Sequence, residues 1–124
     1  MPGTERLRRR IIFEGDRPGG TPVKTVRART AKGFFDVVAG TPRSQAATMV
    51  LKPGQATGGA DNVHAQSDQW LYVISGTGEA TVNGRRLGIE AGELLLIEAG
   101  ERHEIRNTGR ERLVTVNVYA PPEY

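Results

Sequence analysis

Short apolar runs that end at glycine, proline or asparagine set the pattern of hydrophobic and polar positions along this chain. β-Favouring residues dominate 23–26 and 34–38, and the stretch "ATMVLKPG" predicts a strand that ends at Pro53-Gly54. Only the first dozen residues could form a helix, and they lack apolar residues at the helical spacing. The pattern therefore predicts strands and turns from residue 23 onward.

The pattern becomes more regular after residue 69. Trp70–Ile74 is a continuous apolar run, which predicts a strand buried on both faces. Apolar and polar residues then alternate up to Asn83-Gly84, a pair that favours a two-residue hairpin turn because both residues tolerate positive φ. Leu94–Ile97 is a second apolar run, and "HEIRN" and "RLVTVNVYAPP" are separated by a turn at 107–109.

About eight to ten short strands with turns every 8–12 residues or so indicate an all-β fold, an antiparallel barrel or sandwich. The length of 124 residues fits one domain with its own core. We expect an N-terminal arm over 1–22 and a single barrel domain over 23–124.

The alternation around one of the two histidines predicts which side chains face the core. In a strand, His103, Ile105 and Asn107 share one face, and Glu104 and Arg106 share the other. Because Ile105 belongs in a core and the charges belong in water, His103 and Asn107 should face inward. We expect Ile105 and Asn107 to line a pocket beside His103.

The final predicted strand leaves two orientations open. Either the three valines face inward or the alternate residues do, and both sets contain apolar side chains. The valines are Val114, Val116 and Val118, and the alternate set is Leu113, Thr115, Asn117 and Tyr119. This strand should therefore be covered on both sides.

The other histidine, His64, precedes Gln69 by five residues across a short turn. Gln69 shares a strand face with Leu71 and Val73, so its side chain should point inward at the start of the strand. Two imidazoles and one amide oxygen could hold a divalent metal, although glutamine is a weaker ligand than a carboxylate. Inward histidines are more often hydrogen-bonded core residues, and the residue pattern alone leaves both interpretations open.

Four neighbouring side chains have less certain functions. Asp68 could be an alternative ligand, but it more readily caps the turn before the strand. Glu98 could be an acid or base at the pocket mouth, but its place at a strand end favours exposure. Trp70 and Tyr72 lie opposite Gln69, which favours sheet packing or a dimer interface over lining a ligand.

Charge and composition narrow the partners. The net charge is +3, and the excess lies in residues 1–33, which carry nine Lys or Arg against three Asp or Glu. Aromatic residues make up only 6% of the chain and offer no base-stacking platform, so we expect no nucleic-acid partner. No apolar stretch is long enough to cross a bilayer, and no secretory signal is recognisable. The chain contains no cysteine, which is consistent with a cytoplasmic location.

The order of residues around His103 resembles the second sequence motif of the cupin superfamily. In that motif the spacing is Gly, five residues, Pro, one residue, Gly, two residues, His, three residues and Asn. Gly92, Gly100, His103 and Asn107 match it, and Glu98 stands at the proline position.

The stretch around His64 resembles the first cupin motif, in which two histidines separated by one residue precede a glutamate that is followed by a glycine. Counting back from Gly76 places Gln69 at the glutamate position, His64 at the second histidine position and Asn62 at the first. The resemblance covers about residues 45–121 and is closest to small single-domain bacterial cupins.

The resemblance implies a double-stranded β-helix barrel, usually a homodimer, with a metal in the barrel mouth. The implied ligands are His64, Gln69 and His103, with Asn62 as an additional candidate. Zinc, manganese, iron and nickel are not distinguishable from these residues.

Three functions remain open. The first is a metal-dependent oxygenase or isomerase acting on an unassigned substrate. The second is a non-catalytic barrel that binds a small molecule, such as a sugar or metabolite, without metal. The third is an interaction module that uses the basic arm. Fold alone does not decide between these functions. We expect a homodimeric cupin that binds a divalent metal through His64, Gln69 and His103 and takes a small-molecule ligand.

Overall fold

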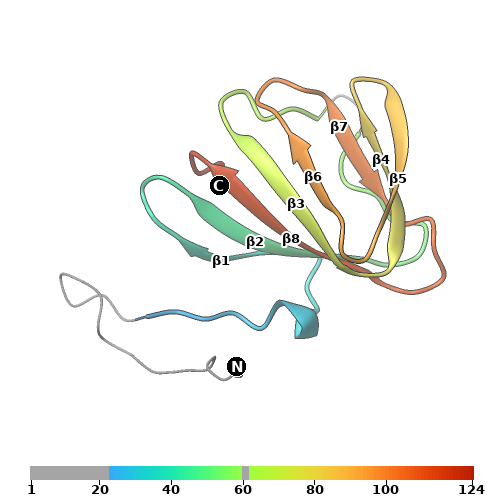
Figure 1. Cartoon of the computed structure of the whole chain (residues 1–124), viewed down its shortest axis with the longest axis horizontal. Helices are drawn as coiled ribbons and strands as arrows, with labels where there is room; N and C mark the ends of the chain where they lie inside the picture. Colours follow the sequence, from blue (N-terminus) through green and yellow to red (C-terminus); the bar gives the residue numbers. More distant parts are fainter. Residues whose placement is uncertain (1–22, 60–61) are drawn as a thin grey trace.

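The computed structural model of the chain describes residues 23–59 and 62–124 (Figure 1). Its regular secondary structure consists of β-strands and one short 3-10 helix. The elements are η2 (Ala28–Thr30), β1 (Phe35–Gly40), β2 (Gln45–Leu51), β3 (Asp68–Ser75), β4 (Thr77–Val82), β5 (Arg85–Glu90), β6 (Leu94–Ile97), β7 (His103–Arg106) and β8 (Leu113–Ala120). The all-β fold class is confirmed. The predicted arm, 1–22, lies outside the described residues.

Two antiparallel sheets form the domain. The larger sheet has the order β1-β2-β8-β3-β6, and the smaller sheet has the order β5-β4-β7. The three strands of the smaller sheet lie together at the upper right of Figure 1. Apolar side chains from both sheets meet between them. This core contains Met49, Leu51, Leu71, Val73, Ala80, Ile89, Ile97, Ile105 and Leu113. Burial of this apolar surface is the main stabilising contribution to the fold.

The predicted alternation holds in the strands that matter for function. On β7, His103 and Ile105 are 3% and 1% exposed, Asn107 directly after the strand is 1% exposed, and Arg106 lies on the outer face. The inward position of these three residues is confirmed. On β8 the inward set is the one that contains Thr115, Asn117 and Tyr119, whereas Val116 and Val118 are half-buried on the other face.

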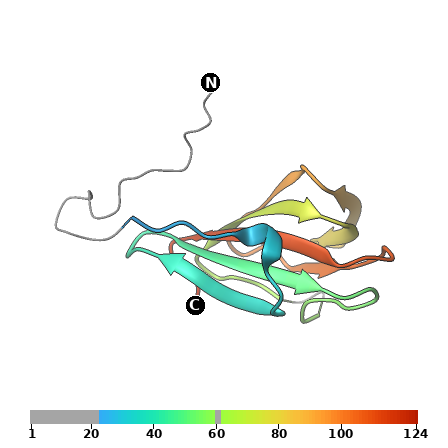
Figure 2. The same cartoon turned by 90° about the horizontal axis from the view of Figure 1, so that it is seen from below.

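Two predictions about the outer surface are wrong. Trp70 is 43% and Tyr72 41% exposed, so β3 is buried on one face only. Both rings therefore lie on an exposed face of the larger sheet, and the short η2 contacts β8 and β3 (Figure 2). Residues 23–26 form no strand, since they are exposed and have no strand beside them to pair with.

Tight turns connect the strands where the sequence places glycine. Asn83 and Gly84 have φ of 50° and 81°, as the predicted hairpin turn between β4 and β5 requires. Between β3 and β4, Gly76 has φ of 92°, and a Cβ there would lie 2.9 Å from the Cα of Leu113. The chain turns sharply at this glycine because the backbone of the segment before β8 passes directly beside it. No described helix is long and apolar enough to span a membrane.

Candidate functional site

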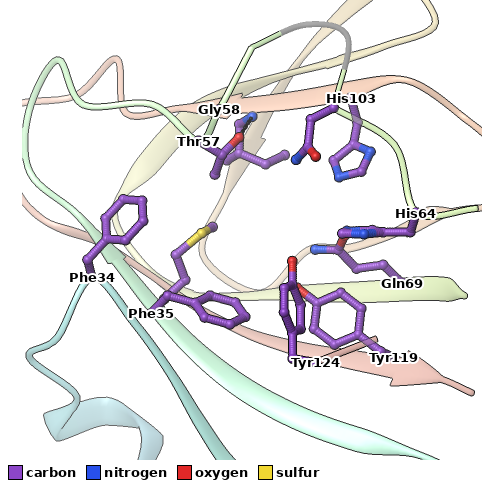
Figure 3. Close-up of a pocket in the computed structure, with 12 residues that line it drawn as sticks. Phe34, Phe35, Thr57, Gly58, His64, Gln69, His103, Tyr119 and Tyr124 are labelled. Carbon is purple, nitrogen blue, oxygen red and sulfur yellow. Dashed lines mark hydrogen bonds between the residues drawn. The ribbon is translucent and has the colours of Figure 1, made fainter. Parts of the chain in front are cut away.

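A cavity of about 260 Å³ lies between the two sheets, and side chains from loops and strands far apart in the sequence line it (Figure 3). The lining residues are Phe34, Phe35, Met49, Thr57, Gly58, Asn62, His64, Gln69, His103, Ile105, Tyr119 and Tyr124. In Figure 3 the polar side chains of His64, Gln69 and His103 gather at one end, and Phe34 and Phe35 lie at the other. The cavity is therefore polar at one end and lined by phenylalanines at the other.

The two histidines meet at the polar end. Their ring centroids are 4.8 Å apart, although the residues are 39 positions apart in the chain. Main-chain hydrogen bonds hold the two segments together: the His103 N–H donates to the Asn62 carbonyl over 2.9 Å, and the Gly100 N–H donates to the His64 carbonyl over 2.8 Å. The loop before β3 and the start of β7 thus place both rings in one site.

The His103 ring is held through Nδ1, which lies 3.1 Å from the Glu101 carbonyl oxygen. A carbonyl oxygen only accepts hydrogen bonds, so Nδ1 carries the proton and Nε2 keeps its lone pair. Burial lowers the pKa of His103 below its ordinary value of 6.5, and the Glu101 carbonyl only partly opposes this. His103 is therefore neutral at pH 7, the form that binds a metal or accepts a hydrogen bond from a ligand.

The His64 ring lies against the segment that follows β8. Its Nδ1 is 3.2 Å from Oε2 of Glu123, and the His64 side chain is only 6% exposed. The two atoms are close but not in line for a hydrogen bond, so this buried nitrogen has no hydrogen-bond partner. The contact is an electrostatic one between a carboxylate and the edge of an imidazole.

Gln69 completes the polar end with an amide whose orientation is fixed from behind. Its Nε2 donates to Oδ1 of Asn117 over 3.0 Å, and Nδ2 of Asn117 donates to Oγ1 of Thr115 over 3.1 Å. All three residues are at most 4% exposed. Oε1 of Gln69 is left buried without a hydrogen-bond partner, which is an unfavourable state for a carbonyl oxygen unless a ligand supplies a donor or a cation.

The donor chemistry of this end fits a divalent metal. Two imidazoles, each with Nδ1 beside an oxygen, and one unpartnered amide oxygen are acceptable ligands for zinc and its neighbours. The described residues contain no group of three or more His, Cys, Asp or Glu that could hold a metal. The set of His64, His103 and Gln69 contains no carboxylate, and it should bind a metal more weakly than a set that includes one.

The remaining predicted site residues divide into two groups. Asn62 and Ile105 line the cavity. Asn107 is buried but does not line it, because Nδ2 donates to the carbonyls of Leu51 and Glu111, and Oδ1 accepts from the Gly109 N–H. Asn107 therefore ties the turn after β7 to the end of β2.

Asp68 and Glu98 are both exposed, and neither lines the cavity. Asp68 accepts a hydrogen bond from the Ala99 N–H over 2.9 Å, so it joins the start of β3 to the turn after β6, the neighbouring strand. It therefore does not cap the turn before β3, in contrast to the prediction from the sequence.

Sequence reasoning missed most of the aromatic lining of the cavity and the carboxylate beside His64. Phe34, Phe35, Tyr119 and Tyr124 line the cavity, and Glu123 contacts His64. A signal existed for Tyr119, because it shares a face of β8 with Asn117. No local signal marks Tyr124 or Glu123, since a side-chain contact with residue 45 holds them in place.

The tyrosines form an aromatic cluster with His64. Ring centroids of Tyr119 and Tyr124 lie 5.3 Å and 6.0 Å from that of His64, and Phe35 packs on Tyr124 at 4.9 Å. Burial raises the pKa of Tyr119 well above its ordinary value, and the neighbouring Tyr124 and Glu123 add to this. The Tyr119 hydroxyl is therefore a neutral hydrogen-bonding group at any physiological pH.

Comparisons with known proteins agree with this architecture. The chain is 31% identical over 86 residues to a mannose-1-phosphate guanylyltransferase of Klebsiella pneumoniae, which covers 69% of the chain and 18% of that protein. It is 36% identical over 75 residues to the tetracenomycin polyketide synthase protein TcmJ of Streptomyces glaucescens, covering 56% of the chain and 49% of TcmJ. The chain thus spans half or less of the length of these relatives.

A solved structure of a protein from Bacillus halodurans superposes with a TM-score of 0.76 at 26% identity, over 89% of this chain and 86% of that one. A double-stranded β-helix protein from Klebsiella pneumoniae superposes with a TM-score of 0.65 at 31% identity, over 77% and 83% of the two chains. The sequence model of the Cupin domain matches residues 47–119, close to the range of the resemblance. The chain belongs to the cupin family.

Proposed function

We propose that this cupin binds a compact small molecule with a polar head and an apolar, preferably aromatic, body. The polar head would lie at a divalent metal held by His64, His103 and Oε1 of Gln69. The unpartnered, buried Oε1 of Gln69 beside the two imidazoles carries this proposal, because it is a preformed acceptor that no described side chain satisfies.

The shape and chemistry of the cavity favour an aromatic ligand. None of the side chains of its twelve described lining residues carries a carboxylate, an ammonium or a guanidinium group. A sugar phosphate, which the name of the guanylyltransferase relative would imply, would find no cationic side chain there, so the proposed metal alone would have to neutralise it. A polyketide, as in the name of TcmJ, presents the phenol and carbonyl groups that suit a polar end facing aromatic walls.

Each part of the chain would contribute differently to binding. A bound metal would supply Lewis acidity that polarises an oxygen of the ligand. Nε2 of His103, freed by the Glu101 carbonyl, and Oε1 of Gln69 would fix the position of the polar head. Phe35, Tyr119 and Tyr124 would pack on its rings and exclude water. Histidine can act as an acid or base, but the proposed metal uses both imidazoles of the lining, and no lining side chain adds a carboxylate. Binding, rather than catalysis as an oxygenase or isomerase, is therefore the function that we propose.

Calorimetric titration of chelator-stripped protein tests both parts of the proposal. We expect Zn²⁺ or Ni²⁺ to bind with one site per chain, and His64→Ala and His103→Ala each to weaken binding at least about tenfold. The probe 2-naphthol should bind more tightly than mannose 1-phosphate. Tighter binding of mannose 1-phosphate would overturn the aromatic assignment.

A metal-free ligand-binding barrel is the second candidate, because the proposed donor set contains no negative charge. If neither cation binds but 2-naphthol does, this second function replaces the first. In that case His103→Ala should still weaken 2-naphthol, since Nε2 would accept its hydroxyl hydrogen directly.

A further inference from the structure

We propose that Glu123 is a positioning residue that fixes the tautomer of His64, and that the buried side chain of Gln45 delivers Glu123 to that position. The carboxylate would keep the proton on Nδ1 of His64 and so leave Nε2 with its lone pair for the ligand. The proposal deepens the proposed function, since it concerns the same site, but it is testable in the absence of metal and ligand.

Gln45 binds the segment after β8 as a neighbouring strand would. Its Nε2 donates to the main-chain oxygen of Tyr124 over 2.7 Å. Its Oε1 accepts from the N–H groups of Glu123 and Tyr124 over 3.2 Å and 2.9 Å. One side chain, 9% exposed at the start of β2, thus satisfies three main-chain groups that are 78 and 79 residues away.

A second contact holds the same segment from the other side. The Ser67 hydroxyl donates to the Pro121 carbonyl over 2.7 Å, and Ser67 is 2% exposed. Ser67 also belongs to the loop that carries His64. The segment 121–124 is therefore attached both to β2 and to the His64 loop, which explains how Glu123 comes to lie against the ring.

The chemistry of the contact requires a proton between the two atoms. Nδ1 of His64 and Oε2 of Glu123 are 3.2 Å apart, and the Glu123 side chain is only 26% exposed. If Nδ1 had a lone pair, it would face a carboxylate oxygen at close range, and the two would repel each other with little water to screen them. A hydrogen on Nδ1 makes the same contact attractive, and small rotations of either side chain would align it.

Fixing the proton on Nδ1 has a direct consequence for binding. The two rings then share one arrangement: His103 is held at Nδ1 by a carbonyl and His64 at Nδ1 by a carboxylate. Each keeps Nε2 unprotonated, which is the arrangement by which outer oxygens orient histidine ligands. Loss of Glu123 should leave the fold intact but make His64 a poorer ligand.

Nitrogen-15 NMR of the two imidazole rings in metal-free protein with EDTA at pH 7.5 tests the proposal directly, because the chain has only two histidines. We expect both rings as the Nδ1–H tautomer in the parent protein. In Glu123→Leu and in Gln45→Leu, His64 should shift towards Nε2–H. His103 should keep the Nδ1–H tautomer in both variants, since its Nδ1 lies against the Glu101 carbonyl.

A matched control is Gln55→Leu, since Gln55 also accepts a main-chain hydrogen bond, from Lys52 over 2.9 Å, but lies outside the cavity lining. It should leave both rings unchanged. Backbone amide spectra of each variant establish that it is folded, and Ser67→Ala offers a second route to releasing the segment. Zn²⁺ affinity should fall about 10- to 100-fold in Glu123→Leu.

An Nε2–H tautomer or an imidazolium of His64 in the parent protein would overturn the proposal. So would an unchanged His64 in folded Glu123→Leu. Because these spectra contain no metal, a failure here leaves the titrations of the proposed function to be judged separately. Conversely, a protein that shows the tautomer shift but binds no cation would retain the positioning effect and lose only the metal.

Discussion

At the scale of single residues, the site depends on an amide where a carboxylate would be the stronger ligand. Gln69 is oriented by Asn117, which is itself oriented by Thr115. Each of the two amides uses its NH₂ group as the donor to the next residue, so Oε1 of Gln69 is left without a hydrogen-bond partner. The neutrality of this amide keeps the empty cavity stable, since an isolated carboxylate at the same depth would be costly to bury.

Gln69→Glu should therefore exchange stability for metal affinity. The new carboxylate adds a negative charge beside the two imidazoles, so Zn²⁺ should bind about tenfold more tightly, equivalent to about 1.4 kcal/mol. Without metal, the carboxylate would face Oδ1 of Asn117 and cost about 1–3 kcal/mol. Calorimetric titration and urea unfolding in EDTA check the two effects. Gln69→Leu is the control: it removes the oxygen ligand without adding a charge, so it should weaken Zn²⁺ binding.

His103 should make the metal-free protein less stable in acid. Its pKa is lowered in the folded state by burial, so as pH falls below about 6.5 the unfolded chain takes up a proton before the folded one does. The free energy of unfolding should thus decrease as pH falls through this window and be insensitive to His103 above it. Urea unfolding in EDTA at pH 7.5 and 5.5 measures the decrease. In His103→Gln the decrease should be smaller, and an equal decrease would contradict the assignment.

At the scale of elements, the turns between strands decide how the two sheets are joined. Gly76 links β3 of the larger sheet to β4 of the smaller one, and Gly92 lies in the turn before β6; both have φ of 92°. Their surroundings differ. A Cβ at Gly76 would meet the backbone of Arg112 and Leu113, whereas a Cβ at Gly92 would meet nothing within 4 Å.

This pair separates backbone strain from steric conflict. Gly92→Ala should cost about 1–2 kcal/mol, the ordinary penalty for a Cβ at positive φ. Gly76→Ala should cost about 1–3 kcal/mol more, because the backbone of the segment before β8 must also move. Chemical denaturation of both variants measures the difference. Equal losses would show that the connection between the sheets is looser than the structure has it.

The elements also show how much of the fold and site the sequence could predict. The inward face of β7 follows from period-2 alternation, because Glu104 and Arg106 are unambiguous, and the spacing of Gly92, His103 and Asn107 resembles the cupin motif. On β8 both faces carry apolar residues, so alternation could not choose between them. Trp70 was expected to be buried from hydrophobicity alone, but whether a face is covered depends on what packs on it. The contacts of Gln45 with residues 123 and 124 depend on tertiary structure, which no local pattern records.

At the scale of the whole molecule, the outer face of the larger sheet is apolar and uncharged over a continuous area. Neighbouring strands pair Trp70 with Leu96 and Tyr72 with Leu94, and the two leucines are 38% and 59% exposed. Val116 and Val118 of β8 continue the same face beside them. Apolar patches of this kind on a sheet are typical of protein interfaces.

A homodimer, which the cupin resemblance implies, should therefore form through this face. A flat sheet face is self-complementary in a two-fold arrangement, and two such faces can pack as layers of a sandwich. Light scattering should give twice the chain mass of 13.5 kDa at micromolar concentration. Trp70→Lys should shift it to a monomer. Leu87→Lys changes a leucine of β5 that is also 40% exposed but lies on the smaller sheet, and it should leave the dimer intact.

The polar end of the cavity takes its side chains from both sheets, with Gln69 on β3 and His103 on β7. A ligand bound there would contact both sheets at once and so connect two layers that pack together mainly through apolar side chains. A bound ligand should then slow hydrogen–deuterium exchange along β3 and β7 together rather than in either strand alone. Ligand binding in the cavity would thus be detectable as reduced backbone flexibility of both sheets.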